Sequence, residues 1–219
     1  MFVGHTAVAL AAKRQAPQVS LGVLLTAAYA LDLLWPLFLL AGIEHVRIDP
    51  GNTAFTPLAL DSYPWSHSLL MVTIWGLAGV VLARTLGIGR RGQIVIFALV
   101  LSHWVLDAIT HRPDMPLWPG QSPMVGLGLW NSIAATLVIE GLLFAAGVVL
   151  YLRATPMRTR TSTLGFLALV VLQLAIWAAQ PWGPPPPDTR TLAWAGLALW
   201  LFPVWGWFID KRARPGRIT

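Results

Sequence analysis

Long apolar segments alternate with short polar ones along most of the chain. Six of them are long enough, at 1.5 Å per helical residue, to cross the ~30 Å hydrocarbon core of a bilayer or nearly so. They cover residues 19–43, 66–84, 92–111, 126–152, 163–180 and 191–209. Residues 1–12 are also apolar, but too short to span. The pattern predicts an all-α integral membrane protein with about six transmembrane helices and a short N-terminal re-entrant or half-helix.

Ionisable residues inside the apolar segments gather in the first half of the chain. We therefore divide it into a half that carries a candidate metal site, residues 1–125, and a C-terminal scaffold of three spans, residues 126–219. No internal repeat or soluble domain is visible. Both parts are expected to form a single membrane domain, packed in the lipid bilayer.

Composition agrees with this class. Of the 219 residues, 56% are hydrophobic and 11% are charged, which is far more apolar than a typical soluble domain. The net charge of +6 raises nucleic-acid binding as a possible function. However, the basic residues form short clusters between apolar segments, which is typical of membrane topology signals and not of a phosphate-binding face. Nucleic acid is therefore excluded as a partner.

The basic residues also predict an orientation, because cytoplasmic loops are enriched in Lys and Arg. With six spans, twelve of the fifteen basic residues fall on one side of the membrane. These are residues 13, 14, 84, 90, 91, 153, 158, 160, 211, 212, 214 and 217. We expect both termini to be cytoplasmic, with Trp65, Trp118, Trp130 and Trp182 near the opposite interface.

The end of the third span carries the first candidate site. His103, Asp107 and His111 follow one another at spacings of four, so they share one helical face. An ionisable group at membrane depth costs roughly 2.5 to 3.5 kcal/mol on insertion scales. Such residues indicate a functional site, although His103 and Asp107 could instead hydrogen-bond neighbouring helices.

Three further ionisable residues fall at comparable depth in other segments. At 1.5 Å per residue, His5 and Asp32 lie about 12 and 20 Å from the cytoplasmic end of their helices, and His67 about 25 Å. With His103 and Asp107 they can meet in the middle-to-outer bilayer. The chain has no cysteine, so any metal is held by nitrogen and oxygen, a set that suits zinc, manganese or iron.

Each residue also has a structural interpretation. His5 lies near a chain end and His67 near an interface, where a histidine costs little. An unpaired Asp32 in an apolar segment is harder to explain without a ligand or proton-relay role.

Other polar residues are weaker candidates. His111 and Asp114 are expected in the outer loop, solvated or supporting the metal ligands. Glu140 fits a general base, a support for the site or a contact between helices. His45 and Asp61 belong to the outer loop.

Four pieces of the chain resemble a known family. They are Gly4-His5, Asp32 at the end of the first long apolar segment, WSHS at 65–68, and SHWVLDAITHRPDMPLWP at 102–119. In this order they resemble the YdjM-like family of bacterial inner-membrane proteins, which are regarded as metal-dependent hydrolases. The last piece is the most specific, and the resemblance covers roughly residues 1–120.

The resemblance implies a bacterial inner-membrane location and a metal centre formed by His5, Asp32, His67, His103 and Asp107. The chain also departs from the family pattern. One aspartate, Asp32, stands where the family has an acidic cluster, and DSYPWSHS at 61–68 lacks an upstream histidine and arginine. Asp61 or Tyr63 can replace those groups. Asp61 and His111 are also candidates for residues that support the metal ligands. The departures argue against a second metal.

These residues lead to a functional hypothesis. A divalent metal, with zinc as the first choice over manganese or iron, lowers the pKa of a water molecule and polarises an ester or phosphoester. Asp107, Asp114 or Glu140 then accepts the proton. A site that opens toward the outer leaflet favours a lipid or lipid-linked substrate.

Two alternatives remain open at this stage. The same intramembrane His and Asp groups can form the relay of a metal-ion or proton transporter. They can also hold a metal that fastens the helices together without catalysis.

Overall fold

The computed structural model describes residues 1–157 and 159–213, and helices make up most of it. Arg158, Arg214 and Arg217, which contributed to the predicted orientation, lie outside the described residues, and so does the side chain of Arg212. The α-helices are α1 Phe2–Ala12, α2 Leu21–Ala28, α3 Ala30–Leu40, α4 Pro64–His67, α5 Leu69–Thr85, α6 Arg90–Thr110, α7 Ile133–Ala154, α8 Arg160–Ala179, α9 Thr189–Gly196 and α10 Leu201–Ala213. Three short 3₁₀ helices are η1 Leu129–Asn131, η2 Gln180–Trp182 and η3 Leu197–Trp200.

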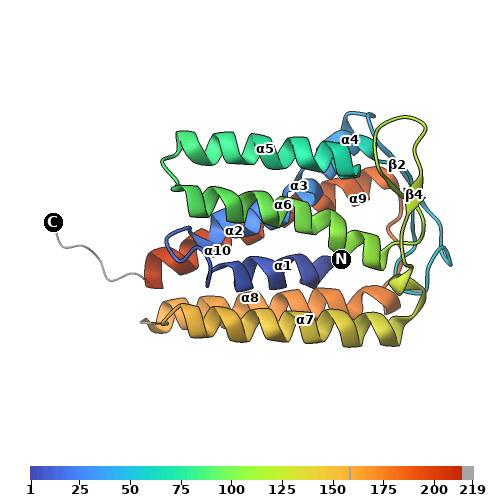
Figure 1. The fold of residues 1–219 in the computed structure, drawn as a ribbon. Helices are drawn as coiled ribbons and strands as arrows, with labels where there is room; N and C mark the ends of the chain where they lie inside the picture. Colours follow the sequence, from blue (N-terminus) through green and yellow to red (C-terminus); the bar gives the residue numbers. More distant parts are fainter. Residues whose placement is uncertain (158, 214–219) are drawn as a thin grey trace.

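The helices form a side-by-side bundle that agrees in outline with the predicted membrane protein (Figure 1). Within the described residues, four helical segments are long and apolar enough to cross a bilayer, namely 90–110, 133–154, 160–182 and 189–211. The bent pair α2–α3 raises this to five. Six spans are not shown by helix length, because α5, at 17 residues, is shorter than the others.

The first predicted span, residues 19–43, is not one straight helix. It is broken at Tyr29, where φ is −95° and ψ is 4°, and α2 and α3 meet at an angle of 56°. Half-helices at membrane depth are tolerated where protein surrounds the break. Tyr29 is fully buried, and its hydroxyl group contacts Thr6 of α1.

Two hairpins, which the sequence did not predict, gather at one end of the bundle (Figure 1). Strand β1 (His45–Ile48) pairs antiparallel with β2 (Leu58–Ser62), and β3 (Met115–Pro116) pairs with β4 (Met124–Val125). The α5–α6 and α7–α8 turns lie at the opposite end, with the end of α10. The basic clusters of these turns are therefore separated from the hairpins by the length of the bundle.

Helix α1 lies in the interior and packs against α2, α6 and α7. Its residues Val3 and Leu10 are fully buried. Gly147 of α7 allows the backbones of α1 and α7 to approach each other closely, because a Cβ atom there would lie 2.5 Å from the carbonyl oxygen of Ala7. The short N-terminal helix is therefore part of the core.

Lys13, assigned from sequence to the basic cytoplasmic boundary, is buried. Its Nζ lies 2.8 Å from Asp210 Oδ2 and 2.6 Å from the carbonyl oxygen of Val19. The backbone N–H of Leu21 donates to the same Asp210 oxygen at 2.7 Å. This ion pair joins the segment after α1 to α10.

Candidate metal centre

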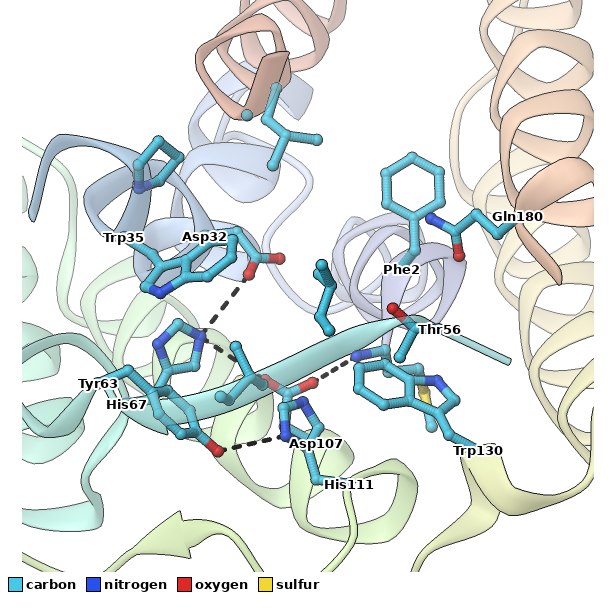
Figure 2. A pocket seen from close by; sticks show the side chains of 16 residues that line it. Phe2, Asp32, Trp35, Thr56, Tyr63, His67, Asp107, His111, Trp130 and Gln180 are labelled. Atoms are coloured by element: carbon cyan, nitrogen blue, oxygen red, sulfur yellow. Dashed lines mark hydrogen bonds and ion pairs between the residues drawn. The ribbon is translucent and has the colours of Figure 1, made fainter. Parts of the chain in front are cut away.

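Five ionisable side chains from four helices meet near the hairpin end of α1. They are His5 of α1, Asp32 of α3, His67 of α4, and His103 and Asp107 of α6. Two sets of three have ligand atoms within 4.8 Å of one another: His5, His103 and Asp107, and Asp32, His67 and His103. Figure 2 shows Asp32 and Asp107 facing the same edge of the His67 ring. The residues that the sequence singled out as metal ligands are thus brought together.

His103 is central to the cluster. Its Nε2 lies 3.0 Å from Asp107 Oδ2 and 3.6 Å from Asp32 Oδ1. The His67 Nε2 lies 3.7 Å from Asp32 Oδ1 and 3.9 Å from Asp107 Oδ2. His5 Nε2 lies 3.1 Å from Asp107 Oδ1, and its ring stacks on that of His103 at 3.7 Å.

The break between α2 and α3 helps to build the site. It places Asp32 in the first turn of α3, where the positive end of the helix dipole stabilises a carboxylate. It also leaves the carbonyl group of Ala28 at the end of α2, where carbonyls lack helical partners. That oxygen lies 2.7 Å from His103 Nδ1.

This contact fixes the tautomer of His103. A carbonyl oxygen only accepts hydrogen bonds, so His103 Nδ1 carries the hydrogen. In a neutral ring the Nε2 lone pair then faces two carboxylates, Asp32 and Asp107, which is unfavourable unless a cation lies between them or the ring is protonated. The chemistry of the donor set therefore fits a cation.

A second chain of hydrogen bonds orients His67 in the same way. Glu44 accepts from the backbone N–H groups of Trp65 and Ser66, both at 2.8 Å, and from Ser66 Oγ at 2.6 Å. Because Ser66 uses its hydroxyl hydrogen for Glu44, its oxygen accepts from His67 Nδ1 at 2.6 Å. The His67 Nε2 lone pair is left facing the cluster.

Sequence reasoning missed Glu44 as part of the site. It is 1% exposed although it ends an apolar segment. A buried carboxylate that orients a ligating histidine is the usual outer partner of a metal site. Its position beside the WSHS motif became clear only from the fold.

The spacing of the donor atoms also suits a metal. Zinc binds imidazole nitrogen and carboxylate oxygen at about 2.0 to 2.2 Å, which places tetrahedral ligands about 3.4 Å apart. The contacts of His103, Asp32 and Asp107 given above, at 3.0 and 3.6 Å, lie on either side of that value. The backbone nitrogen of Met1 also contacts Asp107 Oδ1.

A second polar group lies next to the cluster. Asp114 Oδ1 accepts from Tyr63 Oη at 3.0 Å and lies 3.1 Å from His111 Nδ1. His111, predicted in the outer loop as a solvated residue or a support for the ligands, is 4% exposed at the end of α6 and packs against Trp130. Burial and the neighbouring Asp114 carboxylate raise the pKa of Tyr63 well above its ordinary value. The phenol therefore stays a hydrogen-bond donor.

Both groups line one cavity of about 170 Å³. Asp32, His67 and Asp107 lie on its wall together with Tyr63 and His111 (Figure 2). Three residues of the β1–β2 hairpin region cover it, namely Thr56, Leu58 and Leu60. A small molecule in this cavity would contact three of the candidate ligands, Asp32, His67 and Asp107, together with His111.

The structure places the remaining candidates elsewhere. Glu140 is fully buried on α7, and neither carboxylate oxygen has a hydrogen-bond partner within the described part of the chain. Asp61 binds Arg47 at 2.7 Å on the exposed surface of the hairpin. His45 is exposed on β1. The structure does not bring these three residues into the ligand cluster.

No family model, curated protein or solved structure matches the chain. The site is therefore interpreted from its own geometry.

Proposed function

We propose that this chain is a membrane-embedded, metal-dependent hydrolase of an ester or phosphoester. The observation that carries the proposal is the convergence of His5, Asp32, His67, His103 and Asp107 beside one small cavity. A bound divalent metal, zinc first, would lower the pKa of water and polarise the substrate oxygen. The sequence resemblance to the YdjM-like family is consistent with this chemistry, and we propose a distant relationship.

The residues around the cavity differ in their proposed roles. Both oxygens of Asp107 face histidine nitrogens, which suits a ligand better than a proton acceptor. His111 is placed to accept the proton, because Asp114 orients its Nδ1 and the ring lines the cavity. Of the catalytic carboxylates predicted from sequence, we therefore favour Asp114, acting through His111.

The proposed reaction is an ordinary hydrolysis. The water oxygen bonds to the acyl carbon or the phosphorus, and the bond from that atom to the alcohol oxygen breaks. His111 takes a proton from the water and returns it to the departing alcohol oxygen. Tyr63 donates to Asp114 and keeps that carboxylate in place beside the imidazole.

We infer six spans with both termini cytoplasmic, in a bacterial inner membrane. The inference rests on the basic turns at one end of the bundle and the hairpins at the other. Helix α5 then serves as a short sixth span. Trp65, Trp118 and Trp182 are 44 to 67% exposed and fall on the hairpin side, as interfacial tryptophans do.

Hydrolysis of p-nitrophenyl esters and phosphodiesters by purified protein with added zinc tests the proposal. We expect activity that a chelator removes and zinc restores. His103→Ala should abolish it, while His45→Ala, on the exposed hairpin, should leave it unchanged. Equal activity of His103→Ala and the unaltered chain would refute the proposal.

One observation favours a second candidate, a proton or metal-ion transporter. Two further buried polar residues, Glu140 on α7 and Gln173 on α8, lie at about the depth of the cluster. The buried Lys13–Asp210 pair lies farther along, toward the other end of the bundle. Ion flux into liposomes that His103→Ala abolishes, without any hydrolysis, would establish this alternative.

A further inference from the structure

A second cavity lies between α8 and the segment formed by α9, η3 and α10. Its volume is about 950 Å³, several times that of the cavity at the His and Asp cluster. Apart from Gln180 at one end, the side chains that line it are almost all apolar; Leu172, Phe202 and Trp205 are examples. Two of its polar groups, the Gln180 amide and the Trp35 indole N–H, belong to residues that also line the cavity at the cluster.

The two cavities are adjacent. Five residues line both, namely Phe2, Trp35, Gln180, Gly196 and Leu199. Figure 2 shows the Phe2 ring and the Gln180 amide on the side of the polar cavity away from His67. The apolar space therefore continues directly into the space beside Asp32.

The apolar cavity also borders the region that would face lipid. Leu172 and Ile176 of α8 and Leu201 and Val204 of α10 are 41 to 63% exposed. Along α8 the lining runs from Gly165 to Gln180, about 22 Å at 1.5 Å per residue. This exceeds ~15 Å, half the thickness of the hydrocarbon core, so one lipid chain fits along it.

We propose that the apolar cavity holds the hydrocarbon chain of a lipid substrate whose ester or phosphoester group lies in the polar cavity. The proposal rests on the proposed hydrolase function and names its substrate class. A helix of another protein fits less well than a lipid, because it has no ester or phosphoester group to place in the polar cavity that adjoins the apolar one. Hydrocarbon gains little by leaving one apolar medium for another, so the cavity would position the substrate more than tighten its binding.

The test uses lysophosphatidic acid that carries a photoreactive diazirine in the middle of its acyl chain. The probe is illuminated with the full-length protein in lipid nanodiscs, and the cross-linked peptides are mapped by mass spectrometry. We expect cross-links on α8 and α10 residues that line the cavity. Cross-links spread equally over the exposed faces of α5 and α7 would overturn the proposal.

A pair of alanine variants sharpens the result. Ala195 lies on the cavity wall in α9, whereas Ala175 is exposed on α8 outside the lining. Ala195→Phe should remove the cavity cross-links, and Ala175→Phe should keep them. Ala198→Phe, on the same wall, repeats the test if Ala195→Phe does not fold. Unchanged cross-links in every folded wall variant would contradict the proposal.

Hydrolysis separates this proposal from the one on which it rests. Ala195→Phe should lower the turnover of lysophosphatidic acid about a hundredfold, because a misplaced reacting group has an effect of that size. The turnover of a soluble p-nitrophenyl ester should stay unchanged. Cross-linking should survive His103→Ala, because it needs no chemistry. Localised cross-links without any hydrolysis would refute only the hydrolase, whereas hydrolysis with diffuse cross-links would refute only the lipid-chain site.

Discussion

At the scale of single residues, hydrogen bonds around the cluster determine what the histidines present to it. The carbonyl of Ala28 orients His103, and the Glu44–Ser66 pair orients His67. Outer partners of this kind raise ligand basicity and fix the ring position. We therefore assign Glu44 and Ser66 as positioning residues that contact no substrate.

Replacing Ser66 with alanine tests this assignment. The His67 ring would lose its fixed tautomer, and zinc affinity should fall about 10- to 100-fold. Glu44→Gln should fall in the same range, because the charged acceptor of Ser66 Oγ is lost. Competition with a fluorescent zinc chelator measures the affinity. Asp61→Asn, in the exposed pair with Arg47, is the control and should bind zinc normally.

His111 has a different predicted role and a different signature. If it carries the proton, His111→Gln should lower kcat about 10²- to 10⁴-fold, the usual contribution of a general acid or base. Zinc content should stay unchanged, since the ring lies outside the ligand cluster. Zinc lost in parallel with activity would show that His111 ligates or supports the metal instead. His45→Gln controls for loss of a histidine.

At the scale of elements, close contacts between helices hold the cluster together. Helix α1 carries His5 and approaches α7 at Gly147, where a Cβ atom would meet the backbone of Ala7. At Gly165 of α8 the nearest atom to an added Cβ would be 3.6 Å away, an ordinary contact. Alanine at Gly147 therefore tests the close contact, and alanine at Gly165 serves as its control.

Gly147→Ala should destabilise the protein by about 1 to 3 kcal/mol, because the helices must separate to admit the methyl group. Gly165→Ala should be neutral or stabilising by up to about 1 kcal/mol, as alanine favours a helix. Thermal unfolding in detergent measures both. Equal stability of the two variants would contradict the observed contact.

The sequence predicted which ionisable side chains come together better than it predicted the elements that carry them. His103 and Asp107 were found because two ionisable groups on one face of an apolar helix are costly, and that cost is visible in a single segment. The two hairpins pair strands of only two to five residues, too short for a clear alternating pattern. The bend at Tyr29 is enclosed by α1, a segment more than twenty residues earlier in the chain. Glu44 was missed for the same reason, since its partners follow it by more than twenty residues.

At the scale of the whole molecule, the C-terminal half encloses the half that carries the site. Helix α7 packs on α1, and the Lys13–Asp210 pair joins α10 to the segment after α1. The polar cavity itself includes Trp130, Gln180 and residues of the α9–η3 segment. Residues on both sides of the division predicted from sequence thus line one cavity.

The orientation of the bundle is testable because the chain has no native cysteine. Leu86, 67% exposed in the α5–α6 turn, and Gln121, in the hairpin region, lie at opposite ends. Gln121→Cys should react with a membrane-impermeant maleimide in spheroplasts, and Leu86→Cys only after lysis. The reverse pattern would place the termini outside.

Anomalous X-ray scattering at the zinc edge, from crystals grown with one equivalent of zinc, tests the central claim most directly. We predict a single strong peak about 2.0 to 2.2 Å from His103 Nε2, shared with Asp32, His67 or Asp107. No peak in this cluster, or a peak bound only by other residues, would contradict it.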